Sequence, residues 1–132
     1  MSDYRKLQVW RKAHTLALDA HRAAAGIRGS QYAPFRSQII RAALSIPANI
    51  VEGREQKTEA GFARFLRIAL GSASELDYHL KAARDIQALP NGQYLSLSSQ
   101  VVEVRMMLHG LLRRLEGATR EPEPTTPSVP SC

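Results

Sequence analysis

Residues 41–53, with the sequence RAALSIPANIVEG, decide the fold that we predict for this chain. They continue an apolar line whose members lie three or four residues apart and therefore share one face of a helix: Phe35, Ile39, Ala42, Ile46 and Ile50. A proline inside a helix removes one backbone hydrogen bond and clashes with the carbonyl four residues earlier. We therefore expect this helix to begin near Pro34, to kink or break briefly at Pro47, and to end with Gly53 as its C-cap.

A longer helix is predicted directly after this segment. Thr58 is suited to its N-cap, and Glu59 places a negative charge in its first turn. Its apolar residues alternate spacings of four and three: Phe62, Leu66, Ala69, Ala73, Leu76, Leu80 and Ala83. That heptad seam predicts packing in a helical bundle. Gly71 lies inside the helix at a cost of about 1 kcal/mol relative to alanine, so we expect a neighbouring backbone to pass close beside it.

Two further amphipathic segments flank this pair of helices. The first is expected to run from an N-cap at Asp3 to about Gly26, and the second from between Asn91 and Ser96 to Gly117. The predicted buried stripe of the first comprises Leu7, Trp10, Ala13 or His14, Ala17, His21 and Ala24, and Val9, Leu16 and Ala20 widen it. The predicted seam of the second comprises Tyr94, Leu97, Val101, Val104, Leu108, Leu111 and Leu115. Short connections between four such helices predict an all-α, antiparallel, up-down-up-down four-helix bundle.

The chain divides into this bundle, residues 1–117, and a tail, residues 118–132. The tail holds four of the seven prolines and almost no apolar residue, a composition typical of a disordered or extended segment. The single cysteine, Cys132, lies in the tail, so we expect no disulfide within the chain. No apolar run approaches the roughly 18 residues of a membrane span, and no apolar signal segment precedes the first helix. We therefore expect a cytoplasmic protein with no membrane partner.

The charge balance favours an acidic partner. Lysine and arginine number 18 against 12 aspartates and glutamates, which gives a net charge of +6. Arginine is well suited to binding phosphate, and on the long helix an arginine line includes the small residues Gly71 and Ser74, which allow a phosphate backbone to come close. The predicted RNA- or DNA-binding residues are Arg11, Lys12, Arg41, Arg64, Arg67 and Lys81. The other interpretation is a solvated face with local ion pairs, such as that of Lys81 with Asp77.

Enzymatic chemistry is not indicated. His14 and His21 lie about 10 Å apart along a helix, too far to share one metal ion. Glu75 and His79 are four residues apart, whereas helical di-iron sites use two copies of Glu-x-x-His. No glycine-rich phosphate loop or nucleophile elbow is present. We therefore predict a protein that is not an enzyme, with no catalytic residue, no metal site and no cofactor.

Some apolar residues fall outside the predicted seams. They belong to the first and third helices and include Val9, Leu16, Phe65, Ile68 and Leu70. A bundle of this length cannot turn all of them inward, and exposed apolar patches mark interfaces. We expect self-association into a closed ring or a dimer.

The central stretch resembles a known family. The pattern combines Arg41-Ala42-Ala43-x-Ser45-Ile46-Pro47-x-Asn49-Ile50-x-Glu52-Gly53 with Phe62-x-x-Phe65-Leu66-x-Ile68-Ala69-x-Gly71-Ser72-x-x-Glu75-Leu76. It is similar to the four-helix-bundle family first noticed in intervening sequences of bacterial large-subunit ribosomal RNA genes. Leu7-x-Val9-Trp10-x-Lys12-Ala13 and Met107-Leu108-x-Gly110-Leu111 fit the outer helices of that family, so the resemblance covers roughly residues 4–115.

The resemblance implies a left-handed antiparallel bundle, a homopentameric ring and no known catalytic residues. Proteins of similar fold serve as accessory factors to the reverse transcriptase of diversity-generating retroelements and bind nucleic acid through basic surfaces. The residues that match the family motif are expected to be structural: Ser45, Pro47, Asn49, Glu52, Gly53, Gly71, Ser72 and Glu75. We expect Ser45 and Asn49 to satisfy carbonyl groups that Pro47 leaves without a donor.

The sequence is therefore compatible with two functions. The first is a non-enzymatic, homo-oligomeric bacterial bundle that binds RNA or DNA, or docks an RNA-handling protein such as a reverse transcriptase. The alternative is a protein–protein interaction or structural module with no role in nucleic-acid binding. The sequence alone does not choose between them.

Overall fold

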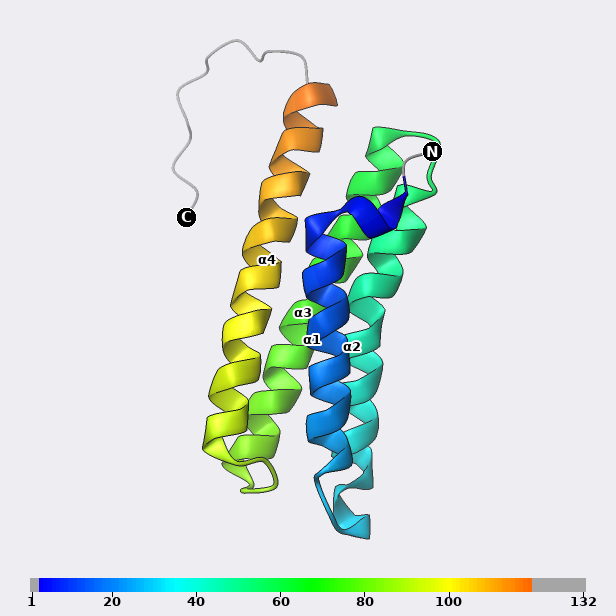
Figure 1. The fold of residues 1–132 in the computed structure, drawn as a ribbon. Helices are drawn as coiled ribbons and strands as arrows, with labels where there is room; N and C mark the ends of the chain where they lie inside the picture. Colours follow the sequence, from blue (N-terminus) through cyan, green and yellow to red (C-terminus); the bar gives the residue numbers. More distant parts are fainter. Residues whose placement is uncertain (1–2, 120–132) are drawn as a thin grey trace, which may run out of the picture.

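The computed structural model describes residues 3–119 of the chain, and this part contains four α-helices, two short 3-10 helices and no strand. The elements are η1 (Tyr4–Lys6), α1 (Gln8–Ala25), η2 (Ser30–Tyr32), α2 (Ala33–Arg54), α3 (Glu59–Asp85) and α4 (Asn91–Thr119). Figure 1 shows the four long helices side by side, joined by short connections at alternating ends. The prediction of an all-α protein with four helices is confirmed.

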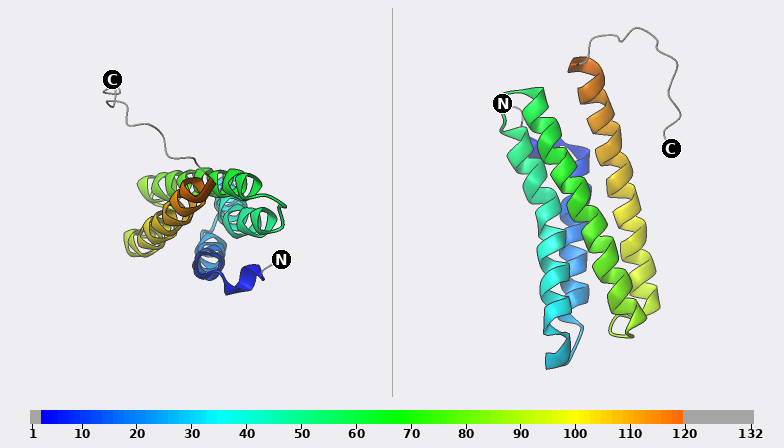
Figure 2. Two further views of the ribbon diagram at one scale, coloured as in Figure 1. Left: turned by 90° about the horizontal axis from the view of Figure 1, so that it is seen from above. Right: turned by 180° about the vertical axis from the view of Figure 1, so that it is seen from behind.

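The helices occupy the four corners of the bundle. Both α2 and α4 pack against α1 and α3, whereas α2 and α4 make no contact with each other among the described residues. They are therefore diagonal neighbours, and Figure 2 shows them on opposite sides of the molecule when it is seen from above. The pair α1 and α4 packs least extensively of the four adjacent pairs.

The predicted seam of α3 forms the centre of the core, since every one of its residues is buried, from Phe62 to Ala83. The apolar line of α2 is buried from Ile39 to Ile50, while Phe35 packs against its edge. In α4 the seam is buried as far as Leu108. Beyond that point Leu112 is buried, and the predicted Leu111 and Leu115 are half-buried. An ideal α-helix drifts against a strict seven-residue repeat, which accounts for this change of face.

The prediction for the first helix is wrong in its start and at one position of its buried stripe. Asp3 caps η1, because its Oδ1 accepts a hydrogen bond of 2.9 Å from the Arg5 backbone N–H, and α1 begins only at Gln8. His21, predicted to lie in the stripe, is exposed, and of the alternatives Ala13 and His14 it is Ala13 that is buried. The buried face consists of Val9, Ala13, Leu16, Ala17, Ala20 and Ala24, all of which belong to the predicted stripe or to the residues predicted to widen it.

The second helix contradicts the expected end at Gly53. It is helical through Pro47, which is buried, so no break occurs there, and it passes Gly53 to end at Arg54. Gly53 is therefore not the C-cap, which is Glu55. A Cβ atom added to Gly53 would lie 2.9 Å from both the Cδ1 of Phe62 and the Cβ of Phe65, so glycine is required there by the close approach of α3.

The prediction that a neighbouring backbone passes close to Gly71 is also wrong. It is exposed, and a Cβ atom added there would meet nothing within 4 Å, so no neighbouring backbone lies close beside it. The start of α3 is as predicted, because the Thr58 Oγ1 accepts a hydrogen bond of 3.0 Å from the Gly61 backbone N–H.

The last helix extends past Gly117, its predicted end, to Thr119. The predicted tail therefore begins inside a helix, and its remaining residues, 120–132, lie outside the described residues. No helix in the described part of the chain is long and apolar enough to cross a membrane.

The apolar residues that fall outside the predicted seams, not all of which were expected to turn inward, divide into three groups. Val9 and Leu16 are buried in the core. Phe65 and Leu70 are half-buried, and Ile68 is exposed. Other large apolar side chains are exposed on α2, where they include Leu44, and on α4, where they are Leu95, Val102 and Met106.

Candidate nucleic-acid interface

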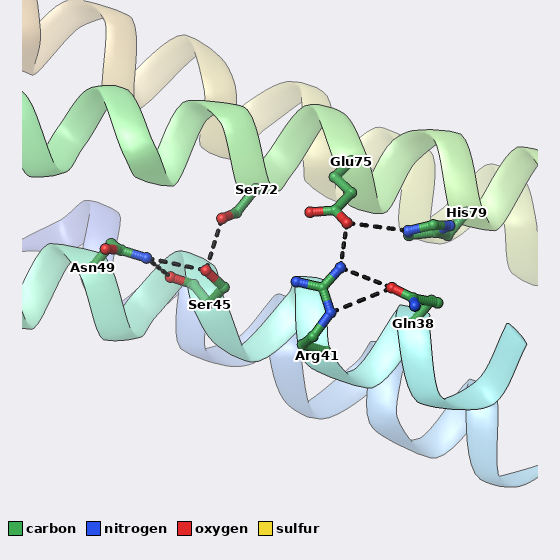
Figure 3. Close-up of polar contacts among 7 residues, drawn as sticks. All are labelled: Gln38, Arg41, Ser45, Asn49, Ser72, Glu75 and His79. Atoms are coloured by element: carbon green, nitrogen blue, oxygen red, sulfur yellow. Dashed lines mark hydrogen bonds and ion pairs between the residues drawn. The ribbon is translucent and has the colours of Figure 1, made fainter. Parts of the chain in front are cut away.

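A chain of polar contacts joins the middle of α2 to α3 (Figure 3). The hydroxyl groups of Ser45 and Ser72 lie 2.7 Å apart across the two helices. The Asn49 Nδ2 donates to the Ser45 carbonyl at 2.8 Å and to the Ser45 hydroxyl at 3.0 Å. All three side chains are buried or half-buried, so each contact satisfies a polar group that water does not reach freely. The Ser45–Ser72 contact joins the two helices, whereas both contacts of Asn49 stay within α2.

The same contacts correct the role predicted for them at Pro47. The carbonyl that loses its donor to a proline is that of the residue four earlier, which is Ala43. The Asn49 side chain instead donates to the carbonyl of Ser45. Ser45 therefore holds α2 to α3 through Ser72, Asn49 bonds within α2, and neither side chain replaces the hydrogen bond that Pro47 removes.

An ionic cluster continues this contact along the two helices (Figure 3). The Arg41 guanidinium donates to the Glu75 carboxylate and, at 2.7 Å, to the Gln38 side chain. The His79 Nε2 lies 3.4 Å from the same carboxylate. The hydrogen bond from Arg41, with a smaller contribution from His79, lowers the pKa of Glu75 from its ordinary value. Arg41 is thus a contact between helices, not a free ligand for phosphate.

Glu52 belongs to the predicted structural motif, but its side chain takes part in none of the described hydrogen bonds or ion pairs. It is exposed near the end of α2, and only its backbone carbonyl takes part, accepting from the Gln56 Nε2 at 3.1 Å.

Most of the predicted phosphate-binding cations contact acidic side chains of their own molecule. Lys12 lies 3.5 Å from Glu103, Arg67 2.8 Å from Glu116 and Lys81 4.0 Å from Asp77. The predicted line of α3 lies on the surface of the bundle, because all of its members are exposed: Arg64, Arg67, Gly71, Ser74, Tyr78 and Lys81. The ion pairs of Arg67 and Lys81 nevertheless occupy two of its three positive charges.

Arg64 and Arg11 differ from the other predicted cations. The Arg64 guanidinium lies 5.4 Å from the centre of the Phe65 ring, and the Arg11 side chain donates to the Arg5 carbonyl at 3.3 Å. Neither has an acidic partner among residues 3–119. The six predicted residues come from three helices and do not converge on one site.

Comparison with known families identifies the protein's relatives. Residues 5–110 match the family described as 23S rRNA-intervening sequence protein. The chain belongs to this family. The match begins and ends within the limits predicted from the motifs of the central stretch, so the family prediction is confirmed.

A solved structure of similar fold supports the same conclusion. It is a protein with unknown function from the S23 ribosomal protein family of Bacteroides thetaiotaomicron, with a TM-score of 0.75 and 26% sequence identity. The alignment covers 80% of this chain and 95% of that one. No curated protein matches the chain.

In this member of the intervening-sequence protein family, several cations at one end of the bundle are not among the binding residues predicted from the sequence. Arg54, Lys57 and Arg114 lie where α2 and α4 end and α3 begins, and they form no salt bridge within the described ranges. Arg114 also lines a hollow of about 180 Å³ between α1 and α4, together with Leu7 and Met107. No pattern within one helix identifies these residues, because pairing depends on what the next helix places opposite each charge.

A further hollow, of about 280 Å³, lies between α1 and α4. The acid that lines it, Asp19, is bound by Arg22 at 2.7 Å and by Gln100 at 3.1 Å. Within residues 3–119 no group of three or more histidine, cysteine, aspartate or glutamate side chains is placed to hold a metal ion.

Proposed function

We propose that this protein is a non-enzymatic, homo-oligomeric bundle of the bacterial cytoplasm that binds the phosphate backbone of RNA or DNA. The observation that carries the proposal is the set of cations without acidic partners at one end of the bundle. Arg11 lies in the first turns of α1, Arg64 near the start of α3, and Arg114 near the end of α4, so three helices contribute. These helix ends lie together in the upper part of Figure 1.

The division of the cations into two groups supports this location. Lys12, Arg41, Arg67 and Lys81 bind acidic side chains, and a phosphate would have to displace those partners first. Unpaired arginines carry no such cost and present planar donors that match phosphate oxygens. The net charge of +6 adds a long-range attraction to a polyanion.

The proposal includes self-assembly. The resemblance implies a homopentameric ring of left-handed, antiparallel bundles, and the proline inside α2 favours a kink at Pro47 in each. Exposed apolar side chains on the outer faces of the helices support contacts between copies. A ring would repeat the basic end several times and so raise its affinity for a long polyanion. An RNA-handling protein such as a reverse transcriptase would then meet the nucleic acid on the assembled particle.

Salt-dependent binding tests the proposal. Anisotropy of labelled single-stranded RNA and duplex DNA should give dissociation constants below about 10⁻⁴ M at low salt, with an affinity that falls steeply as salt rises. Arg64→Ala and Arg114→Ala should each reduce the slope of log affinity against log salt by about one if each removes one phosphate contact. Arg28→Ala, an exposed arginine in the connection at the opposite end, is the matched control.

Two results would reject this function. One is affinity weaker than about 10⁻⁴ M at low salt, and the other is binding without a salt slope. A protein partner recovered from the host that survives nuclease treatment would then support the alternative, an interaction module without a nucleic-acid role. A slope reduced equally by Arg28→Ala would place the contact elsewhere on the surface.

A further inference from the structure

The outward face of α4 carries a second apolar seam, on the side away from the core. Leu95, Val102 and Met106 are 56%, 51% and 68% exposed, and their spacings of seven and four place them on one face. His109 and Arg113, both exposed, continue the line at spacings of three and four. The segment from Val102 to Arg113 is about 16 Å long. A face of this kind on a helix marks a surface that packs against another helix.

The outward face of α2 carries a seam with the same spacing. Leu44 is 47% exposed, and Ala48, Val51 and Glu55 follow it at spacings of four, three and four. Ala48 and Glu55 are exposed, and Val51 is half-buried. The residues of the core line, such as Ile46 and Ile50, lie on the other side of the helix.

The two seams are complementary when the helices are laid parallel in register. The pairs are then Leu44 with Val102, Ala48 with Met106, Val51 with His109, and Glu55 with Arg113. The smallest side chain of one seam meets the longest apolar side chain of the other, and an acid meets a base at the same end. Neither Glu55 nor Arg113 has a salt bridge in the part of the chain that the structure describes.

The place of the two helices in the bundle allows this pairing only between copies. Since α2 and α4 are diagonal and do not touch, their outward faces point away from each other (Figure 2). They also run in the same direction, from the lower to the upper end in Figure 1. Copies that stand side by side in one orientation therefore bring α4 of one molecule parallel to α2 of the next.

We infer that the seam of α4, Leu95 to Arg113, docks on the seam of α2, Leu44 to Glu55, in a second copy of this chain. The inference rests on the proposed self-assembly and names the surfaces that make it. Because the two surfaces differ, the contact is head-to-tail, and a pair of copies keeps one free surface of each kind, one on each copy. Such a contact forms a ring when the rotation between copies closes and a filament when it does not.

Mixing two blocked variants tests the inference. Ala48→Glu blocks the α2 seam and Met106→Glu the α4 seam, and each places an uncompensated charge against apolar side chains. Each variant alone should be monomeric by light scattering, and an equimolar mixture should give a 1:1 dimer and nothing larger, because one intact surface of each kind remains. Tyr78→Glu, at a side chain 66% exposed on α3, controls for the charge itself and should leave the wild-type assembly intact.

A charge exchange tests the register. Glu55→Arg and Arg113→Glu should each weaken assembly at least several-fold in dissociation constant, and the double variant should recover most of the loss. Both residues are exposed in the single chain, so circular dichroism should report unchanged folding.

The outcomes separate this inference from the proposed function. A wild-type monomer at every concentration tested would reject the proposed self-assembly and the inference with it. A wild-type oligomer that both seam variants leave intact would reject the inference alone. Assembly lost in Met106→Glu but kept in Ala48→Glu would also overturn it, because it would indicate a symmetric contact of α4 with α4. Equal loss in Tyr78→Glu would show that the two seams are not specific.

Discussion

The contact between α2 and α3 and the contact between α1 and α4 are built differently, although charged residues line both. Between α2 and α3 the helices approach so closely that Gly53 has no room for a Cβ, and the hydroxyls of Ser45 and Ser72 meet across the contact. Between α1 and α4 lie two hollows, of about 280 Å³ and 180 Å³, and the helices are joined at the surface by Lys12 with Glu103.

The difference shows which residues serve the fold and which remain available. Close approach buries polar groups and makes their loss costly, so residues between α2 and α3 are structural. In the looser contact the ionic groups stay in water, where an ion pair contributes little. The family motif lies almost entirely in the close contact, and its conspicuous polar residues are therefore part of the architecture. Ligand contacts are to be sought on the outer surfaces and at the basic end of the bundle.

The largest effect is expected at Gly53. Gly53→Ala places a Cβ 2.9 Å from atoms of Phe62 and Phe65, so α2 and α3 must move apart, at a cost of about 1–3 kcal/mol in the free energy of unfolding. Gly71→Ala is the matched control, because its Cβ meets nothing within 4 Å, and it should stabilise the protein by about 0.5–1 kcal/mol. Urea denaturation followed by circular dichroism measures both. If the two substitutions had the same effect, the close approach would not be a feature of the folded protein.

The next effect concerns the buried hydroxyl contact. Ser45→Ala removes the partner of Ser72 and one of the two acceptors of Asn49, so we expect a loss of about 1–2 kcal/mol. Ser74→Ala, at an exposed position on α3, should change stability by less than about 0.5 kcal/mol. Equal values for the two serines would remove the distinction between a polar contact that holds helices together and a solvated one.

The ionic contact of the same helices should be weaker and should depend on pH. The side chains of Arg41 and Glu75 are 55% and 40% exposed, so water screens them, and Glu75→Gln should cost at most about 1 kcal/mol at neutral pH. Because folding lowers the pKa of Glu75, its contribution is present above the pKa of the unfolded chain and is lost as the pH falls through the lower folded value. Wild type and Glu75→Gln should therefore become equally stable in acid. A difference that persisted there would have another cause.

The smallest effect is expected for the surface pair between α1 and α4. Lys12 and Glu103 are 45% and 51% exposed and 3.5 Å apart, so Lys12→Gln should change stability by less than about 0.5 kcal/mol. Raising the salt concentration should abolish even that difference. A loss as large as that of Ser45→Ala would mean that both contacts hold the bundle equally, which would contradict the comparison.

Much of the fold followed from local patterns. The seam of α3 and the Thr58 cap were predicted correctly, because a heptad repeat and an N-cap are properties of one helix. The predictions for Gly53 and Gly71 were both wrong for one reason. A glycine in a helical pattern can mark the end of the helix or the close approach of another helix, and only the position of the other helix shows which of the two applies. In α1 the pattern included His21, which is exposed, because a spacing of three and four places a residue near a face without showing where that face ends.

The sequence by itself determined that four amphipathic helices form, which faces of α2, α3 and most of α4 turn inward, and which family the chain belongs to, because these depend on spacing along one helix. Only the tertiary structure decided which cations are free, which glycine needs its missing side chain, and which apolar residues remain outside. Pairing and close approach depend on the residue that another helix places opposite. Segments as far apart in the sequence as Arg41 and Glu75, or Arg67 and Glu116, meet only after the helices have packed.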